Sequence, residues 1–302
     1  MTTPSSDAGA QIGRDPKGAR QPSPSLEPGL YVVATPIGNL RDITLRALDI
    51  LGAADRIYAE DKRVTRKLLD AYALKTPLSA YHEHNAEAAR AEILDALGQG
   101  ARIALVSDAG TPLVSDPGFK LVRAALEAGF TVTPAPGASA VLAALVGAGL
   151  PSDRFLFAGF TPHKTGARRA MFEELRDARA TLILFETGPR LADSLADMAA
   201  VFGPRPAVVA RELTKLYEQF RRAPLDELAA HYDGAPAPKG EIVVLIGPPA
   251  PPPDVDAETL DAFLREALHS HGVKEAAGLA AERLGVPRRT AYNRAIALKD
   301  GA

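Results

Sequence analysis

Cysteine is absent from the 302-residue sequence, which excludes a disulfide scaffold, a thiolate metal site and a cysteine nucleophile. The absence also fits a reducing compartment, so a cytoplasmic location is expected. No run of about 18 uninterrupted apolar residues occurs, and we therefore expect no membrane span. The N-terminus lacks the apolar stretch of a signal peptide, so export is not expected.

The sequence also has no excess of positively charged residues. The chain has 35 Lys and Arg against 37 Asp and Glu, a net charge of −2. Because proteins that coat nucleic acid are strongly basic, any RNA contact must use a local patch. The 46% share of hydrophobic residues is sufficient for a core.

The sequence pattern divides the chain into five segments. Residues 1–28 hold many Pro, Gly and Ser and predict a disordered tail. Residues 29–150 alternate short apolar runs with helical spacing and predict an N-terminal α/β domain with a parallel sheet. Residues 151–247 predict a second α/β domain with a mixed sheet. Prolines predict a stiff linker over 248–256, and residues 257–302 predict a helical tail like a helix-turn-helix unit.

Short apolar runs predict the strands, and helical spacing predicts the segments between them. Asp42 is the expected N-cap of the first helix. Helices are also predicted over residues 86–97 and 120–128. Strands are predicted over residues 30–34, 56–59, 102–106, 130–133, 154–158, 181–185, 207–211, 217–222 and 241–246.

Three loops follow strands of the first predicted sheet, over residues 35–39, 107–118 and 134–140. Ligands of open α/β sheets bind at this carboxyl edge. The loops are not dinucleotide or P-loop motifs, and their prolines remove N–H donors that a phosphate needs. Because Asp108 and Asp116 add carboxylates, a neutral or cationic ligand such as S-adenosylmethionine is favoured. The alternative is that the loops are turns in which these two residues cap helices.

Several stretches resemble a known family. They are LYVVATPIGNLRDITLRAL (30–48), YAEDKR (58–63), YHEHN (81–85), SDAGTPLVSDPG (107–118), PGASA (136–140), GLPSDRF (149–155), RELTKLYE (211–218) and KGEIVVLIG (239–247). Together they resemble the tetrapyrrole methylase superfamily, and within it a branch that methylates a cytidine 2′-hydroxyl in the decoding region of 16S rRNA. Two departures are Lys62, where the branch usually has Thr, and Gly188–Pro189, where it has a Pro-His or Thr-His pair.

The resemblance implies two α/β domains with S-adenosylmethionine bound between them. It also implies 16S rRNA in the small ribosomal subunit as the partner, and a homodimer. The cofactor-binding residues that it implies are Pro36, Asp108, Gly110, Thr111, Ser139 and Ala140 from the first domain, and Phe185, Glu186, Ala210, Lys239 and Gly240 from the second.

A ribose hydroxyl must lose a proton as it attacks a methyl group, so a base is needed. Glu60, Glu212 and Lys215 are the catalytic candidates. Arg neighbours would lower the pKa of Lys215 and make it the base, with Glu212 orienting it. The alternatives are that residues 60–63 cap and pair on a helix, and that Arg211 and Glu212 form a buried ion pair.

RNA contact needs positive charge. Candidate patches are residues 62–67, Lys164 with Arg168 and Arg169, Arg221 with Arg222, and the tail, whose residues 273–302 hold six Lys and Arg against three acids. Solvated helix faces are the alternative. Since His82 and His84 lack a third ligand, no metal is expected. The candidate substrate-binding residues are Arg63, Arg66, His82, Asn85, Arg190 and Arg211.

Two other functions compete with ribose methylation. A superfamily cousin would C-methylate a porphyrinoid, a polyanion that also needs Arg and Lys. A nucleic-acid-binding protein would act through the helical tail alone.

Overall fold

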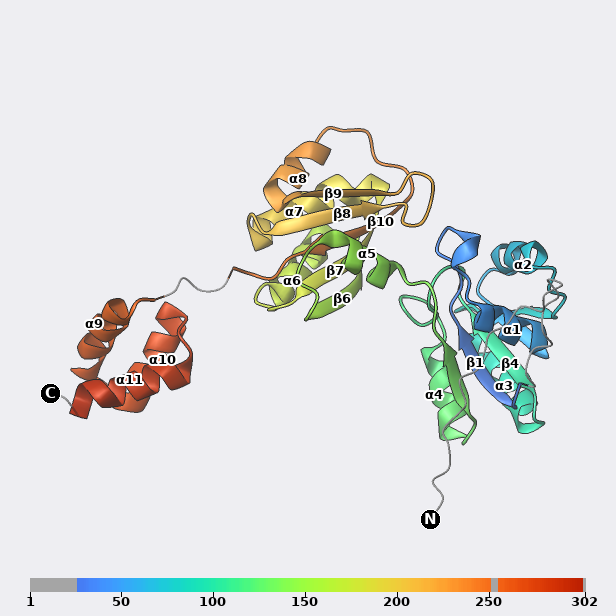
Figure 1. Ribbon diagram of the computed structural model, residues 1–302, viewed down its shortest axis with the longest axis horizontal. Helices are drawn as coiled ribbons and strands as arrows, with labels where there is room; N and C mark the ends of the chain where they lie inside the picture. Colours follow the sequence, from blue (N-terminus) through green and yellow to red (C-terminus); the bar gives the residue numbers. More distant parts are fainter. Residues whose placement is uncertain (1–25, 251–254, 301–302) are drawn as a thin grey trace, which may run out of the picture. The chain divides into compact units, whose positions relative to one another are not determined.

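The computed structural model describes residues 26–250 and 255–300 (Figure 1). Residues 1–25 of the predicted tail and 251–254 of the predicted linker lie outside the described residues. The chain forms two compact units, Met1–Gly247 and Pro248–Ala302. The predicted division of the first unit near residue 150 stays a prediction.

The first sheet is parallel, and both of its faces are buried. Its strand order is β3-β2-β4-β1-β5. Leu30 and Leu105 pack into one core and Val33 and Ala104 into another, which explains the nearly continuous apolar runs. The strands are β1 (Gly29–Val33), β2 (Arg56–Ala59), β3 (Leu78–Ala80), β4 (Arg102–Val106) and β5 (Val132–Ala135), and the helices between them are α1 (Leu45–Ala53), α2 (Lys62–Ala71), α3 (Ala86–Gly98) and α4 (Phe119–Glu127).

The strand order places a switch point between β1 and β4. The chain leaves β1 toward β2, on one side, and leaves β4 toward β5, on the other. The loops that follow these two neighbouring strands therefore diverge and leave a crevice at the carboxyl edge. The loops join at their base, where Thr35 and Gly110 exchange backbone hydrogen bonds of 2.8 and 3.0 Å.

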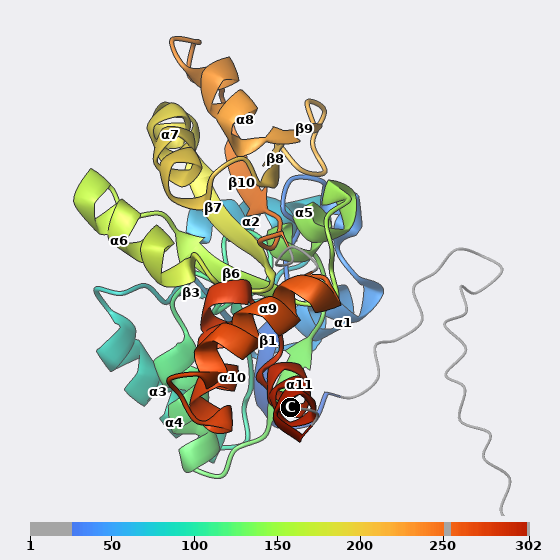
Figure 2. The ribbon, with the colours of Figure 1, turned by 90° about the vertical axis from the view of Figure 1, so that its left-hand side faces the viewer.

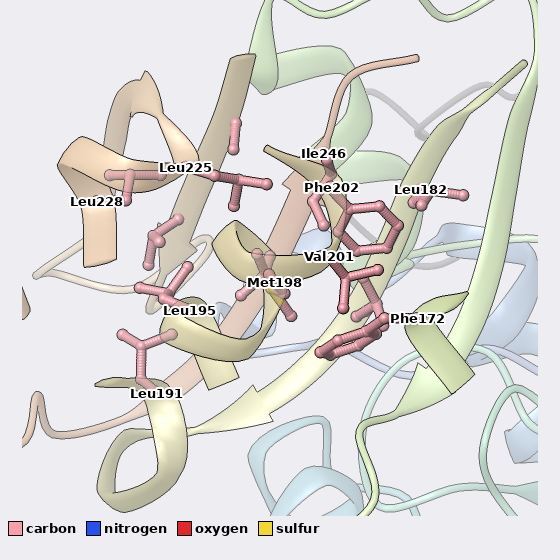
Figure 3. Packing of buried hydrophobic residues seen from close by; sticks show 14 of the residues in the cluster. Phe172, Leu182, Leu191, Leu195, Met198, Val201, Phe202, Leu225, Leu228 and Ile246 are labelled. Carbon is pink, nitrogen blue, oxygen red and sulfur yellow. The ribbon is translucent and has the colours of Figure 1, made fainter. Parts of the chain in front are cut away.

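The second sheet is mixed, with strand order β6-β7-β10-β8-β9. Helices α6 (Thr165–Leu175), α7 (Leu191–Phe202) and α8 (Leu225–Tyr232) cover one face, and α5 (Ala140–Ala148) covers the other (Figure 2). Figure 3 shows Phe172, Met198 and Leu225 in the core under α7. The strands are β6 (Phe155–Phe160), β7 (Thr181–Thr187), β8 (Pro206–Arg211), β9 (Gln219–Pro224) and β10 (Glu241–Ile246).

The C-terminal unit consists of α9 (Ala257–Leu268), α10 (Val273–Leu284) and α11 (Arg288–Asp300). Alanines of α10 and α11 let the helices pack closely. Gly285 takes the left-handed conformation that ends α10. Arg294, one of the basic residues of the predicted tail, forms a two-bond ion pair of 2.5 and 2.6 Å with Asp261 of α9.

Among the described residues, no helix is both long and apolar enough to cross a membrane.

The parallel first sheet, the mixed second sheet and the C-terminal helices are confirmed, but local details differ. The strands predicted over residues 130–133 and 217–222 begin two residues later, at Val132 and Gln219. Strand β3 was missed, because its three residues are all half-buried and alternate in no clear pattern. Asp42 is not an N-cap, since it lies in a 3₁₀ turn and Thr44 accepts the capping bond from Ala47 N–H.

A buried ion pair links α6 to α7. The side chains of Arg168 and Asp197 are only 4% and 5% exposed, and Asp197 also accepts a 2.6 Å bond from Arg169. Replacing Asp197 with Ala leaves the guanidinium of Arg168 buried without an anion. We expect a loss of about 3–5 kcal/mol in the free energy of unfolding, measured by urea denaturation.

The control for Asp197→Ala is Glu173→Ala, which breaks an exposed ion pair with Arg176 on the same helix. It should cost less than about 1 kcal/mol. Equal losses in the two variants would contradict the structural role given to Asp197.

Candidate active site

A cavity of about 470 Å³ opens at the carboxyl edge of the first sheet, and residues of both sheets line it. This volume is in the range of small-molecule sites. Its polar lining includes five carboxylates, and its apolar lining includes Ile37, Val114, Phe160 and Phe185. The carboxylates are Glu60, Asp108, Asp116, Glu186 and Glu241.

The loop after β4 is held in an unusual backbone conformation. Leu113 and Ser115 have φ values of 72° and 66°, which residues other than glycine rarely adopt. The Ser107 hydroxyl donates to the Gly110 carbonyl at 3.1 Å, and the Thr111 hydroxyl donates to Ala138 in the loop after β5 at 3.1 Å. Such strain is retained where the surrounding structure enforces it, and it is enriched at functional sites.

The segment between β8 and β9 crosses to the loop after β1. A Cβ atom on Gly38 would lie 2.4 Å from Cγ of Lys215, so the side chain of Lys215 rests directly on the backbone of that loop. Glu212 and Thr214 of the same segment also have positive φ, 52° and 65°. The segment therefore joins the two halves of the cavity at its rim.

Asp116 and Glu60 are carboxylic acids that ionise reluctantly. Burial raises the pKa of Asp116 to about 6, the charges of Glu60 and Asp108 add to this shift, and a hydrogen bond with Ser107 opposes it. Burial also raises the pKa of Glu60, with further contributions from Asp108 and Glu83. Asp108 accepts the 2.8 Å hydrogen bond of the Asp61 N–H. The carboxylates of the cavity therefore repel one another, and a bound cation would reduce this repulsion.

Glu186 is already satisfied by the protein. Its carboxylate accepts hydrogen bonds from the hydroxyls of Thr161 and Ser194, from the Thr187 N–H and from Arg190. Burial alone would raise the pKa of Glu186, but these bonds outweigh it and leave the pKa below its usual value. Arg190, a predicted substrate-binding residue, is therefore engaged by Glu186.

The predicted lowering of the Lys215 pKa is wrong. Burial lowers this pKa, but bonds of 2.7 Å to Glu212 and 2.9 Å to Glu241 outweigh it and raise the pKa above its usual value. Lys215 is therefore a cation in this conformation. Its hydrogen bond in turn lowers the pKa of Glu212. The alternative ion pair between Arg211 and Glu212 is not formed, because Glu212 pairs with Lys215.

Most of the predicted cofactor residues line the cavity. Ala210 instead lies in the core behind it, and Pro36 precedes the lining residue Ile37. The cavity also contains Asp116, which the sequence placed on a ligand-binding loop but not among the cofactor-binding residues. Glu241 was missed, although the Lys-Gly-Glu motif marks its position. The lining residues that were predicted are Asp108, Gly110, Thr111, Ser139, Ala140, Phe185, Glu186 and Gly240, together with Glu60 among the catalytic candidates.

The predicted substrate residues on the first sheet have different local roles. Asp61 caps α2, and Arg63, whose side chain is 89% exposed, pairs with that cap at 2.6 Å. This confirms the alternative for Asp61, namely a helix cap with a surface partner. Asn85 bonds the His82 N–H and the Ala80 carbonyl and so shapes the loop before α3. Within residues 26–250 and 255–300, no three potential metal ligands come together.

The structure removes several cations from the predicted RNA patches. Arg168 and Arg169 both pair with Asp197, and Arg222 donates to the carbonyls of Gly147 and Ala148. The cations of α2 remain accessible, and α2 begins directly after the lining residue Glu60. These exposed residues are Lys62, Arg66 and Lys67.

The fold and the cavity define a class of protein that sequence comparison identifies. A profile described as "Tetrapyrrole (Corrin/Porphyrin) Methylases" matches residues 29–229. A second profile, "RsmI C-terminal HTH domain", matches residues 253–299. The chain belongs to the tetrapyrrole methylase family, and the fold class that the motifs predicted is confirmed.

Full-length relatives narrow the family to the ribosomal RNA small subunit methyltransferases I. The protein of that name from Mesorhizobium japonicum is 51% identical over 92% of this chain and 95% of its own length. That of Erythrobacter litoralis is 52% identical over 91% and 96%, and that of Escherichia coli O157:H7 is 46% identical over 88% and 94%. The resemblance drawn from the motifs is therefore confirmed.

Solved structures share the fold at lower identity. A conserved hypothetical protein from Aeropyrum pernix matches with a TM-score of 0.57 and 18% identity over 91% of this chain and 98% of its own. A uroporphyrin-III-C-methyltransferase from Thermus thermophilus matches with a TM-score of 0.52 and 23% identity over 72% and 93%.

Because the pKa of Asp116 is raised, replacing Asp116 with the neutral residue Asn should stabilise the protein, and the gain should depend on pH. The folded protein binds this proton more tightly than the unfolded chain, so ionisation of Asp116 costs stability as pH rises from about 4 through about 6. Asp116→Asn should therefore raise the free energy of unfolding at pH 7.5, by on the order of 1 kcal/mol once solvent screening is included. Urea denaturation at a series of pH values measures this.

The gain should be much smaller at pH 3.5, where Asp116 is protonated in the folded protein and mostly protonated in the unfolded chain. Asp153→Asn is the control, because it neutralises an exposed carboxylate outside the cavity. A gain for Asp116→Asn that is the same at pH 3.5 and 7.5 would contradict the electrostatic cause.

Proposed function

We propose that the protein transfers a methyl group from S-adenosylmethionine to a cytidine 2′-hydroxyl in the decoding region of 16S rRNA, within the small ribosomal subunit. The observation that carries this proposal is the acidic, partly apolar cavity between the two sheets, in a chain that matches small-subunit rRNA methyltransferases along its length. The low identity to the porphyrinoid enzymes gives no comparable support to the alternative of porphyrinoid C-methylation.

The cavity residues fit S-adenosylmethionine. The carboxylates of Glu60, Asp108 and Asp116 suit its ammonium and sulfonium charges, while Phe185 and Ile37 offer apolar surface to the adenine. When bound, this cofactor supplies a methyl group activated by the sulfonium charge. Asp108, Gly110, Thr111, Ser139, Ala140 and Gly240 would hold it.

Two groups of residues divide the remaining work. Glu60 and Asp116 are carboxylates that form no ion pair with any described residue. We therefore assign them the role of accepting the proton of the attacking ribose hydroxyl. Lys215 and Glu212 are positioning residues, because their ion pair holds the segment between β8 and β9 against Gly38. The exposed cations of α2 would meet rRNA phosphates beside the cavity.

The assembled small subunit is the preferred substrate in this proposal. The accessible basic surface of the protein is modest, so recognition would also use the shape of the folded rRNA. Such a substrate implies action in the cytoplasm. We also propose a homodimer. Leu142 and Val146, one turn apart on α5, are 51% and 80% exposed and would be covered by a second copy.

The charge of the cavity predicts discrimination between cofactor and product. S-adenosylhomocysteine lacks the sulfonium charge, so it gains less from the carboxylates. Asp116→Asn should weaken binding of S-adenosylmethionine by about tenfold, equivalent to about 1.4 kcal/mol, and should weaken S-adenosylhomocysteine clearly less. Calorimetry at pH 7.5 measures both, with Asp153→Asn as the control. Equal losses for the two ligands would remove the charge argument.

Methyl transfer itself is tested with labelled S-adenosylmethionine, unmethylated small subunits and naked 16S rRNA. We expect label on a cytidine ribose of the decoding region, and more of it in the subunit. A chain ending at Gly247 should keep cofactor binding, because the first unit contains the whole cavity. Loss of cofactor binding in this truncated chain, or label in neither RNA, would contradict the proposal, and the latter would favour a small-molecule substrate.

A further inference from the structure

Arg211 and Arg221 lie on the same face of the second sheet. Strands β8 and β9 form an antiparallel pair (Figure 1). Within this pair Arg221 stands opposite Val209, and Arg211 is two residues beyond Val209 on β8. Side chains two residues apart on a strand point to the same face, and directly opposed residues share a face. Arg211 and Arg221 are therefore diagonal neighbours.

Both guanidinium groups have a buried N–H that lacks a partner. The Nε–H groups of Arg211 and Arg221 are buried and donate to no described residue. The side chain of Arg221 makes no hydrogen bond or ion pair with the described part of the chain. Arg211 donates only to the Lys239 carbonyl, at 3.3 Å. The nearby carboxylate of Glu212 is already paired with Lys215.

This pattern differs from that of Arg168 on α6 and of Arg190, which directly precedes α7. Arg168 and Arg190, which are also withdrawn from solvent, each bind a carboxylate. Two adjacent cations with unsatisfied donors repel each other and cost stability unless an anion joins them. Such a pair of forked donors matches the oxygens of a phosphate group.

The pair also lies beside the cavity. Arg211 stands opposite Ile242 on β10, and Ile242 lines the cavity. The Lys239 carbonyl that Arg211 contacts precedes Gly240, another lining residue. Val209 and Ile242 belong to the core under α6, α7 and α8, so the pair stands on that face of the sheet, with Arg211 at the end of β8. A phosphate held there would lie at the edge of the cavity and outside it.

We propose that Arg211 and Arg221 form a phosphate-binding site that grips one phosphodiester of the RNA substrate next to the target nucleotide. The RNA assignment rests on the proposed function, whereas the capacity to bind an anion does not. Of the predicted RNA patch of Arg221 with Arg222, the site retains Arg221 and pairs it with Arg211. It places the RNA backbone along β8 and β9.

The test measures binding of unmethylated small subunits at KCl concentrations from 50 to 200 mM. Arg221→Gln should weaken binding about tenfold at the lower salt and reduce the slope of log affinity against log salt by about 0.7, the value for one lost phosphate contact. Arg211→Gln should behave alike. The control is Arg176→Gln, which removes the same charge from an exposed ion pair on the second domain and should change neither quantity.

Calorimetry with S-adenosylmethionine checks that each variant is folded, and its affinity should be unchanged. Unchanged RNA affinity and salt slope in Arg221→Gln would overturn the site. If Arg221→Gln also loses cofactor binding, Arg221→Lys decides. Arg221→Lys keeps the positive charge but loses the forked pair of donors. If it binds RNA more weakly than the wild type with an unchanged salt slope, the result supports a forked contact between Arg221 and a phosphate. If it binds RNA with wild-type affinity, the result overturns that contact.

A second probe separates this site from the proposed function. Pyrophosphate should raise the melting temperature of the wild-type protein and of Arg176→Gln, and the rise should be lost in Arg221→Gln. If the wild type methylates neither rRNA substrate but keeps this response, the proposed function fails and the anion site stands. Equal responses in wild type and Arg221→Gln would overturn the site whatever the methylation result.

Discussion

The cavity depends on the ammonium of Lys215, which two carboxylates of the second sheet hold over the backbone of the first. Glu212 and Glu241 fix its position, and the missing side chain of Gly38 lets its methylene groups rest on the loop after β1. This contact adds to the apolar cluster that contains Ile37 of the first loop and Leu213 of the segment between β8 and β9. The main role of this interaction is therefore structural. The two ion pairs also keep Lys215 protonated, so it does not act as a base.

The backbone around this contact is strained on both sides of the cavity. Glu212 and Thr214 on one loop, and Leu113 and Ser115 on the other, all have positive φ. Each such residue costs about 1–3 kcal/mol, which the rest of the fold must offset. The buried cores on both faces of both sheets supply that support. The loops are consequently held in shape before any ligand arrives, which reduces the entropy lost on binding.

Much of the fold could be predicted because burial on both faces gives strands an apolar signature. Strands β1, β2, β4 and β10 were placed within a residue for this reason. Strand β3 carries no such signature, and the N-cap of α1 was misplaced because Asp42 and Thr44 are equally good capping residues in sequence. The structure decides between them through the position of the first helical turn.

The electrostatics of the site could not be predicted from neighbours in sequence. Arg211 is near Lys215 in sequence and suggested a lowered pKa, but Glu241, 26 residues away, is one of the groups that bind its ammonium. Likewise, Asp197 pairs with Arg168 across 29 residues and removes it from the predicted RNA surface. Motifs identify which residues gather at a site, whereas pairing depends on contacts that only the folded chain brings together.

The arrangement of charge explains how a protein with a net charge of −2 could handle both a cationic cofactor and a polyanionic substrate. Carboxylates without ion-pair partners are gathered inside the cavity, at Glu60 and Asp116, and cations without such partners lie outside it, at α2 and at Arg211 with Arg221. Arg168 and Arg169 of α6 are neutralised by Asp197, and Arg190, which precedes α7, is neutralised by Glu186. Pairing, rather than composition, therefore sets which charges face a ligand. A short stretch of RNA drawn to the outer cations would present its ribose to the inner carboxylates, while its phosphates stay at the rim, where those carboxylates repel them least.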